Sequence, residues 1–441
     1  MYAGTVDVTA QPRVPSLPGP AEGAGTRIPL TVFGVVFVDL LGFGIVIPQL
    51  GIYGYELHAS PFVVGLLLSV YSLMQFVFAP FLGRLSDRVG RKPVLVASIL
   101  GSLVGYLLFA WARSLPLLFL ARIVDGISGG NLSTAQAYVA DITTRQNRAK
   151  GMGMVGAALG LGFVVGPGVG GVLGAWGGNR AIGLAAAALC AANLVGIIFF
   201  LPESRRPSSE PATVKSLARL SQVARLPGVG ICLVLALVLV TAFSQMEGTF
   251  TTFLISRFLS LGPVPVRGGV FSVVPVVSDA LTHEASLKSG YLFLAVGLLA
   301  VLVQGGLLGR LKARFGEGRL VGVGAAAATL GLFLLPTAPS YRMLFLPMGL
   351  LSVGSALYMP SLSALVSLRS PGGRQGEALG TFQAMGSLGR ILGPALGGLL
   401  FAVVSPSAPF LVAGGLGVLA MFLAPRILSS RLRHPSGAAP D

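Results

Sequence analysis

The stretch GRLSDRVGRKP, from Gly83 to Pro93, lies between two long apolar segments and recurs in altered form as GRLKARFGEGR, from Gly309 to Arg319. The two stretches start 226 residues apart, and five of their first ten positions are identical. A second pair, GFVVGPGVGG from Gly162 and GRILGPALGG from Gly389, keeps almost the same offset, 227 residues, again with five identities in ten. Two independent matches at one spacing indicate two related halves, each with a basic turn and a Gly-Pro helix.

The chain is too apolar for a soluble domain. Of its 441 residues, 54% are apolar and 10% are charged, and the mean hydropathy is +0.83, whereas soluble domains are about 25% charged. Crossing a bilayer takes roughly 17–25 apolar residues. We therefore predict an all-α membrane protein with twelve transmembrane helices in two pseudo-symmetric six-helix bundles. The predicted spans are Ile28–Leu50, Pro61–Leu82, Pro93–Ala112, Leu115–Ala140, Met152–Trp176, Ala181–Leu201, Val229–Leu254, Gly290–Gly309, Leu320–Thr337, Met343–Val366, Ala378–Val403 and Pro409–Pro425.

The basic residues predict which side of the membrane each loop faces. With both termini in the cytosol, the inside segments hold 23 Lys and Arg and the outside loops hold 6. The remaining two, Arg122 and Arg390, lie within spans, which accounts for all 31. Because positive charge favours cytosolic loops, this orientation is predicted. The net charge of +16 then reflects anionic lipid headgroups and not nucleic acid. We expect a multi-pass protein of the plasma membrane or an organelle membrane.

Three further segments lie outside the predicted bundles, and one insertion lies within the second. The predicted organisation is a disordered cytosolic N-tail (1–27), the first bundle (28–201), a basic cytosolic linker (202–227), the second bundle (228–425) with an extra outside loop at about 263–281, and a cytosolic C-tail (426–441). The loop follows from unequal spacing. Glu247 lies 62 residues before Gly309, whereas Asp39 lies 44 residues before Gly83.

Five ionisable residues lie within predicted spans, where each charge costs roughly 2.5–3.5 kcal/mol on insertion scales. They are Asp39, Arg122, Asp125, Glu247 and Arg390. In spans 4, 7 and 11, polar or small residues accompany them at helical spacing, which favours helix faces toward a shared aqueous cavity. Carboxylates in such a cavity can carry a proton between the two sides of the membrane.

Each of these residues has a structural alternative. Arg122 and Asp125, three positions apart, can neutralise each other as a static pair. Asp39 and Glu247 can hydrogen-bond a neighbouring helix and never titrate, and Arg390 can extend toward the membrane surface. The sequence leaves these alternatives open. Weaker candidates for lining the cavity are Tyr71, Gln75, Asn131, Gln304 and Tyr358. Such residues more often pack or form hydrogen bonds between helices.

Two Gly-Pro pairs occupy matched positions in the two halves, Gly166–Pro167 and Gly393–Pro394. Each Pro removes an amide donor and kinks its helix, while nearby glycines let another helix approach closely. Such a helix in each half can contact both halves while the cleft between them opens and closes. Alternatively, the kinks have no role in gating. Duplicated bundles of this kind are typical of alternating-access transporters.

The first basic turn contains a single acid, Asp87, among Arg84, Arg88, Arg91 and Lys92. A carboxylate is favoured at a helix N-terminus, so Asp87 can cap a helix of the other half and act as a latch. The matching position in the second turn is Ala313. The acidic latch is therefore confined to the first half.

These motifs resemble the major facilitator superfamily, and within it the drug:proton antiporter branch. GRLSDRVGRKP is similar to the superfamily's signature between helices 2 and 3. DLLGFGIVIP, from Asp39 to Pro48, resembles the branch's helix 1 motif, and Arg122 with Gly126 resembles its helix 4 motif. GFVVGPGVGG resembles its helix 5 antiporter motif. The similarity runs from about residue 28 to residue 425 and implies the major facilitator fold.

Other stretches refine the resemblance. ARIVDGISGG, AYVADIT and RQGEALGTFQ are most similar to tetracycline-efflux antiporters, and SQMEGTFTTFLISRF resembles orphan animal members of the superfamily. The resemblance implies that Asp87 is the inside latch and that Arg91 pairs with Asp141. It also implies that Arg122 is a partner in proton or substrate coupling and that Asp39 is a cavity acid.

Three departures argue against a metal–tetracycline substrate. The positions of two acids and a histidine of the tetracycline carriers are occupied by Gly105, Ala328 and Ala300. Proton coupling would therefore depend on Asp39 and Glu247, together with Asp125.

The expected function is secondary transport of a small organic solute by alternating access, with proton-coupled antiport. Two alternatives remain: a proton-independent facilitative carrier, and a non-transporting sensor or scaffold on a transporter fold. No nucleophile–base pair or metal-ligand cluster is evident in the sequence, so we expect neither an enzyme nor a cofactor. We expect the protein to be a monomer.

Overall fold

A computed structural model describes residues 30–143, 148–204, 222–223, 225–259, 279–371 and 375–429. Within these ranges the chain is helical apart from short connections, and it contains no strand. Most of the predicted tails, linker and outside loop lies outside the described residues. One correction concerns that loop: its last three predicted positions belong to a helix, which begins at Asp279.

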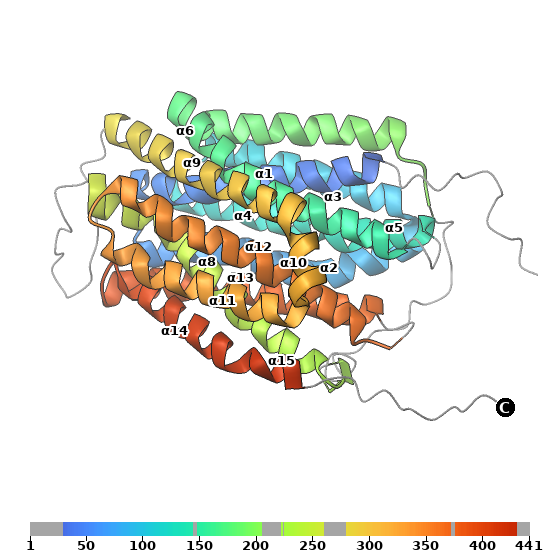
Figure 1. Cartoon of the computed structure of the whole chain (residues 1–441). Coiled ribbons are helices and arrows are strands. Elements are labelled where there is room, and N and C mark those ends of the chain that lie inside the picture. Colours follow the sequence, from blue (N-terminus) through green and yellow to red (C-terminus); the bar gives the residue numbers. More distant parts are fainter. Residues whose placement is uncertain are drawn as a thin grey trace, which may run out of the picture.

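The first half contains six helical spans, whose helices are labelled α1 to α6 in Figure 1. They are formed by α1 (Leu30–Glu56), α2 (Pro61–Val89), α3 (Arg91–Trp111), α4 (Leu115–Ser128) continued by η1 (Gly129–Asn131) and α5 (Leu132–Ile142), and α6 (Arg148–Phe200). Gly177 and Gly178 have non-helical backbone angles, so α6 is two helices joined at these glycines. This break confirms the predicted division between spans 5 and 6.

The second half repeats the arrangement. Its elements are α8 (Val229–Leu254) with η2 (Ile255–Leu259), α9 (Asp279–Leu302) with η3 (Val303–Leu307) and α10 (Leu308–Phe315), α11 (Glu317–Leu334) with η4 (Leu335–Thr337), η5 (Tyr341–Leu344) with α12 (Phe345–Leu368), α13 (Gln375–Val403), and α14 (Ala408–Leu423) with α15 (Pro425–Ser429). Eleven described helical stretches are long and apolar enough to cross a membrane. One of the eleven, Val165–Phe200, contains the break in α6.

Several predicted boundaries were wrong because hydropathy detects only the apolar part of a helix. The first helix continues past Leu50 to Glu56. The eighth span begins at Asp279 and not at Gly290, because its first turns are polar, and it runs on to Phe315. The basic turns are mostly helical. Each is reduced to one glycine with positive φ, Gly90 at 105° and Gly316 at 75°, a conformation that glycine adopts without strain.

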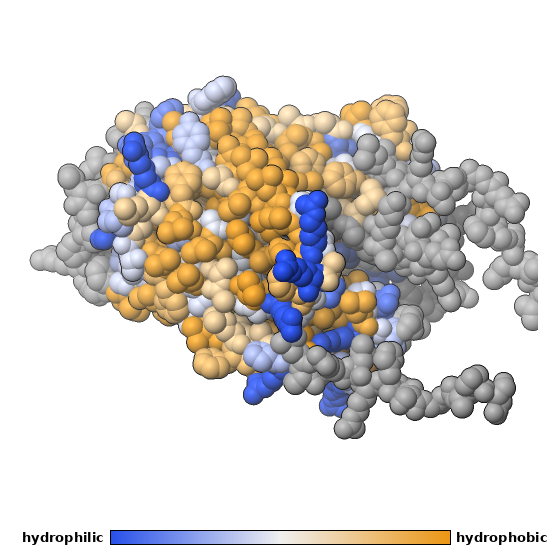
Figure 2. All heavy atoms as spheres, viewed as in Figure 1, coloured by the Kyte–Doolittle hydropathy of each residue, from blue (hydrophilic) through white to orange (hydrophobic). Residues whose placement is uncertain are grey.

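Each half has its own buried apolar core. One cluster is drawn entirely from the first half, and the other two come almost entirely from the second. Large apolar side chains also cover the outside: Trp176, Phe199 and Phe422 are exposed. Figure 2 shows apolar side chains across the middle of one face. A lipid-facing surface accounts for this pattern, because hydrocarbon solvates such side chains.

The halves are joined mainly by α2 against α13 and by the first part of α6 against α9. Glycine allows these helices to touch through their backbones. A methyl group at Gly171 would overlap the Cα atom of Gly290, and one at Gly65 would overlap the carbonyl oxygen of Pro394. Close approach at small residues is how helices associate within a bilayer.

The close contacts gather at one end of the molecule, which we call the closed end. There Ser69 Oγ donates to the carbonyl oxygen of Ile391 at 2.7 Å, and Ser286 Oγ donates to Gln49 Oε1 at 3.1 Å. The opposite ends of the same helices differ. Methyl groups at Gly305 in η3, and at Gly376 and Gly380 in α13, would meet no described atom within 4 Å. We call this the turn end, since it carries Gly90 and Gly316.

The Gly171–Gly290 contact predicts a steric effect of substitution. Gly171→Val should separate α6 from α9 and expose Ser286, which is fully buried beside Gln49. A cysteine introduced at Ser286 should then react faster with a maleimide in the Gly171→Val background. Gly196→Val is the matched control, because a side chain at Gly196 meets open space. Equal labelling of Ser286→Cys in both backgrounds would contradict the steric role of this contact.

Candidate functional site

Arg122 lies at the centre of the first half, on α4, and is only 1% exposed. Its Nη1 is 2.8 Å from Asp125 Oδ2. The guanidinium lies over the ring of Tyr71, 4.5 Å from the centroid, and near Phe43 at 5.7 Å. A cation over an aromatic face is stabilised by the ring's negative charge. The Arg122–Asp125 pair expected as one alternative is therefore formed, with an aromatic platform that the sequence did not indicate.

This guanidinium is incompletely paired. Nε and Nη2 of Arg122 are buried and donate to no protein atom among the described residues. Buried donors without acceptors are costly, on the order of 1–3 kcal/mol each. The Arg122–Asp125 ion pair therefore leaves two donors of Arg122 without an acceptor.

The structure shows what surrounds Gly105, the position at which tetracycline carriers have an acid in helix 3. A methyl group at Gly105 would lie 2.9 Å from Asp125 Cβ, so α3 packs against α4 at this point. A carboxylate at position 105 would meet Asp125 directly. The departure from the tetracycline-carrier pattern thus leaves Asp125 without a second acid beside it from α3.

Asp39 on α1 lies in a separate small recess of the first half. It lines a small cavity together with Gln75 from α2 and Asn131 from η1. Gln75 Nε2 donates to the carbonyl oxygen of Gly129 at 2.9 Å. Asp39 is half-buried and forms no ion pair among the described residues. The other residues that line this cavity are apolar, so Asp39, Gln75 and Asn131 form a small polar cluster in an apolar surrounding.

Glu247 on α8 and Arg390 on α13 bring opposite charges together in the second half. Both are half-buried, and they attract each other electrostatically without being in ion-pair contact. Arg390 Nη2 donates to Ser387 Oγ, one turn earlier, at 3.1 Å. The next residue, Ile391, accepts the Ser69 Oγ hydrogen bond from the first half. Arg390 therefore lies next to the boundary between the halves.

The Gly-Pro helices contact both halves. Within its own half, Gly166 packs on α1 so closely that a methyl group would lie 2.6 Å from Gly44 Cα, and one at Gly393 would lie 2.7 Å from the carbonyl oxygen of Thr241. Across the boundary, Pro394 meets Gly65. Pro167 is buried beside these contacts. Gln304, in η3, is exposed and lies toward the turn end.

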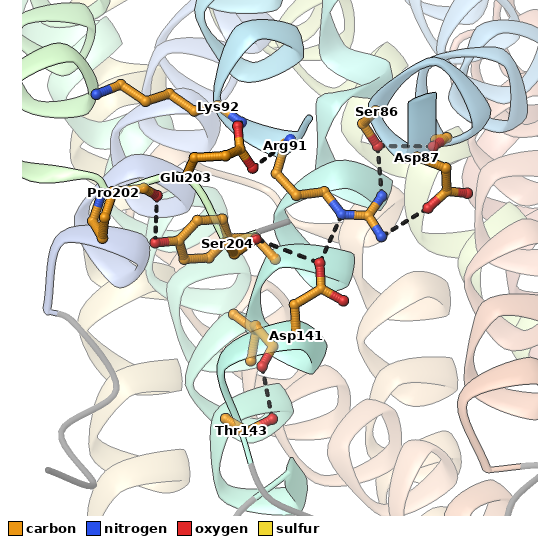
Figure 3. A network of polar contacts seen from close by, with 12 residues as sticks. Ser86, Asp87, Arg91, Lys92, Asp141, Thr143, Pro202, Glu203 and Ser204 are labelled. Carbon is orange, nitrogen blue, oxygen red and sulfur yellow. Dashed lines mark hydrogen bonds and ion pairs between the residues drawn. The ribbon is translucent and has the colours of Figure 1, made fainter. Parts of the chain in front are cut away.

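A polar network ties together helix ends at the turn end of the first half (Figure 3). Arg91, only 4% exposed, is its centre. Arg91 Nη2 is 2.8 Å from Asp87 Oδ1, and Nε is 2.9 Å from Asp141 Oδ2. Nη1 donates to Ser86 Oγ at 2.7 Å. The structure thus joins α2, α3 and α5 through one guanidinium, while Arg88 is exposed.

Sequence reasoning missed Glu203, which belongs to the same network. Its carboxylate accepts the backbone N–H groups of Arg91 and Lys92. The available signal was an acid directly after Pro202, at the end of a predicted span. Nothing in the sequence says which distant helix such an acid reaches.

Comparison with known proteins identifies this arrangement. The family model described as Major Facilitator Superfamily matches residues 32–303 and 259–440. The chain belongs to the major facilitator superfamily. It is 33% identical over 376 residues to the class C tetracycline resistance protein of Escherichia coli, which covers 85% of this chain and 89% of that protein.

An animal relative and a solved structure are also similar. Major facilitator superfamily domain-containing protein 10 of Mus musculus is 27% identical over 475 aligned positions, covering 98% of each chain. The crystal structure of the human organic anion transporter MFSD10 (TETRAN) has a TM-score of 0.66 at 26% identity, covering 90% of this chain and 98% of that one. These relatives confirm the family resemblance and the fold. The chain is a multi-pass membrane transporter with a small-molecule substrate, and not an enzyme.

The burial of the Arg122–Asp125 pair predicts a characteristic stability pattern. Asp125→Asn leaves an uncompensated buried charge and should destabilise the transporter by about 3–5 kcal/mol. Replacing both residues by Leu should be less harmful than Asp125→Asn alone. Glu284→Gln, which breaks the exposed Glu284–Lys288 pair, should cost about 0–1 kcal/mol. Unfolding of purified protein in detergent measures all three. Equal effects of Asp125→Asn and Glu284→Gln would contradict the buried pair.

Proposed function

We propose that the protein moves a small organic solute by alternating access and exchanges it for protons. The observation that carries the proposal is the location of the charged residues. Arg122 and Asp125 lie in apolar helices of one half, and Glu247 and Arg390 in those of the other. In the described part of the chain, the close contacts between the halves are at the closed end. A substrate held between them would be released on the other side when the contacts move from one end to the other.

The orientation follows from the charge distribution. With 23 basic residues in the segments predicted inside and 6 in those predicted outside, the turn end faces the cytosol together with both termini. The conformation described above is then inward-facing, and closure of the turn end completes the cycle. Asp87 is the inside latch in this cycle. In the present state it pairs with Arg91 of its own half.

Asp39 and Glu247 are the proposed proton sites. Each is a half-buried acid, one from each half, and neither forms a salt bridge among the described residues. In antiport, protons and substrate bind in alternation. Arg390 links the two events, because its attraction for Glu247 changes when Glu247 gains or loses a proton.

Two observations narrow the class of substrate. Gly105, Ala300 and Ala328 stand where tetracycline carriers have ionisable groups, which disfavours a metal–tetracycline complex. The human relative is described as an organic anion transporter, and Arg390, which is half-buried, is a positive group available to an anionic substrate. Organic anions are therefore the first class to include in an unbiased screen of reconstituted vesicles.

Two other functions remain testable. The absence of the helix 8 histidine, Ala300 here, favours a facilitative carrier without protons, whose flux would ignore an imposed pH gradient. A sensor or scaffold on the same fold would bind a solute in purified form without moving it.

Neutralising the acids tests the coupling. Asp39→Asn and Glu247→Gln should each abolish the acceleration of flux by a pH gradient in liposomes, since neither amide can carry a proton. Glu284→Gln is the matched control at an exposed acid and should keep wild-type pH dependence. Unchanged pH dependence in both cavity variants would eliminate proton antiport through these residues.

A separate prediction concerns the latch. Asp87→Asn keeps the size of the side chain but weakens the ion pair with Arg91 and any capping role in the alternate state. Turnover should fall while the amount of protein in the membrane stays normal. Flux at the wild-type rate would remove Asp87 from the gating mechanism.

A further inference from the structure

A histidine bridges the two halves at the closed end. Nδ1 of His283, in the second turn of α9, lies 2.7 Å from the carbonyl oxygen of Ala175 in α6. The two residues are 108 positions apart in sequence and belong to opposite halves. A carbonyl oxygen can only accept a hydrogen bond, so Nδ1 carries the proton and donates it. Because His283 is exposed, its ring can exchange protons with water.

The acceptor of this bond lies at the end of a helix. The first part of α6 ends at Gly177 and Gly178, whose backbone angles are not helical, and Ala175 lies in the last turn before them. The carbonyl groups of a last turn have no N–H partner within their own helix. They also carry partial negative charge, because the peptide dipoles of a helix are aligned. His283 therefore supplies a donor to this helix end from the other half.

The same helix meets the first half at two further points along its length. One turn beyond His283, Ser286 Oγ donates to Gln49 Oε1 at 3.1 Å. One turn beyond that, Gly290 meets Gly171 backbone to backbone. The contact of α9 with the first half is thus made by backbone at Gly290 and by neutral polar groups at Ser286. Its ionisable member is His283, which is exposed.

The charged groups around this end of α9 have other partners. Lys288 Nζ is 2.6 Å from Glu284 Oε1 and lies over the Tyr341 ring, while Glu56 accepts a hydrogen bond from Asn179. The side chains charged at neutral pH at this end of α9, and of α1, α6, α8 with η2 and α12 with η5, which surround it, are Glu56, Arg180, Arg257, Asp279, Glu284, Lys288 and Arg342. Among side chains of ordinary pKa, only histidine changes its charge between about pH 5 and 8.

Protonation of the His283 ring changes the strength of the contact with Ala175. A neutral ring donates one hydrogen bond between uncharged groups. A positively charged ring donates a stronger bond and is also attracted by the negative end of the helix dipole. When the halves part at the closed end, the carbonyl group moves away from the ring. The charged form of His283 therefore loses more than the neutral form when the closed end opens.

We propose that His283 is a proton-binding residue of the gate at the closed end. With its proton bound, it holds the end of the first part of α6 and keeps this end shut; without the proton, its hold is weaker. By linkage, the shut conformation binds this proton more tightly than the open one. Because the closed end is predicted to face outside, acid on that side favours the inward-facing conformation. This role is separate from the proposed exchange of protons at Asp39 and Glu247.

The size of the effect follows from the interaction between a cation and a helix C-terminus. Between about pH 8 and about pH 5.5, the ratio of shut to open molecules at the closed end should rise by roughly 2–5-fold, which corresponds to about 0.3–1 kcal/mol.

The test measures conformation and requires no transport assay. Spin labels at Ser60→Cys, before α2, and Ser405→Cys, after α13, report the closed end through a pair of helices that does not include α9. Labels at Arg84→Cys in α2 and Arg314→Cys in α10, both exposed positions, report the turn end. The two native cysteines are buried. Distances are measured in the purified full-length protein at the higher and the lower pH.

The measurement is made in a background that carries Asp39→Asn and Glu247→Gln. The proposed proton sites of transport then contribute nothing to the pH dependence, so this test and the test of proton antiport can fail independently. In this background, lowering the pH should increase the short distance across the closed end and the long distance across the turn end together.

Two substitutions of His283 separate its charge from its hydrogen bond. His283→Asn places an amide nitrogen near the position of Nδ1, so it keeps a donor without a charge, and it should abolish the shift with pH. His283→Lys is charged at both pH values and should hold the closed end shut at both. His58→Asn is the matched control, because His58 is an exposed histidine in the connection between α1 and α2. It should retain the full shift.

Three results would overturn the proposal. The first is a pH dependence of equal size with His283 and with His283→Asn. The second is loss of the shift in His58→Asn, since a general effect of surface charge would then explain it. The third is a closed end in His283→Lys that is no more shut than in His283→Asn, because a positive charge would then have no hold on the helix end. Since His283 is exposed, these variants should fold, and the presence of both distance populations in each variant verifies it.

Discussion

Backbone-to-backbone contact at glycine is the constraint on which the rest of the structure depends. At the closed end, Gly171 meets Gly290 and Gly65 meets Pro394 with no side chain between them. Such contacts gain dispersion energy from close packing but need few polar bonds to be broken when the helices part. Among the described residues, the side-chain hydrogen bonds between the halves are correspondingly few, as at Ser69, His283 and Ser286. The close contact between the halves can therefore open at the cost of few hydrogen bonds.

The two halves use their charges differently. In the first half, Arg122 and Arg91 organise two clusters, one within the membrane helices and one at the turn end. In the second half, Glu247 and Arg390 attract each other without contact, and the turn carries Ala313 where the first has Asp87. The two halves therefore share the arrangement of their helices but differ in their charged residues.

Much of the fold could be predicted from the sequence, because duplication and hydropathy act over long stretches. The repeated turns at Gly83 and Gly309 established two halves, and the break at Gly177 and Gly178 falls between two predicted spans. Helix ends were predicted poorly, since polar first turns such as the one at Asp279 leave no hydropathy signal. The eighth span was misplaced for that reason.

The candidate site was predictable in composition but not in geometry. Intramembrane charge marked Arg122 and Glu247, because burying charge without purpose is costly. Sequence spacing could suggest the Arg122–Asp125 pair but not the Tyr71 ring beneath it. Glu203 was invisible for a related reason: its partners are backbone N–H groups more than 100 positions away, and backbone groups carry no sequence signature.

Alternating access requires that the closed end opens whenever the turn end closes. Spin labels at Ser60→Cys, before α2, and Ser405→Cys, after α13, span the closed end from one half to the other. Alternating access predicts two distance populations in membranes, with the longer one growing under conditions that shorten the Arg84–Arg314 distance. A single short distance across the closed end in a preparation that is actively moving solute would contradict the claim.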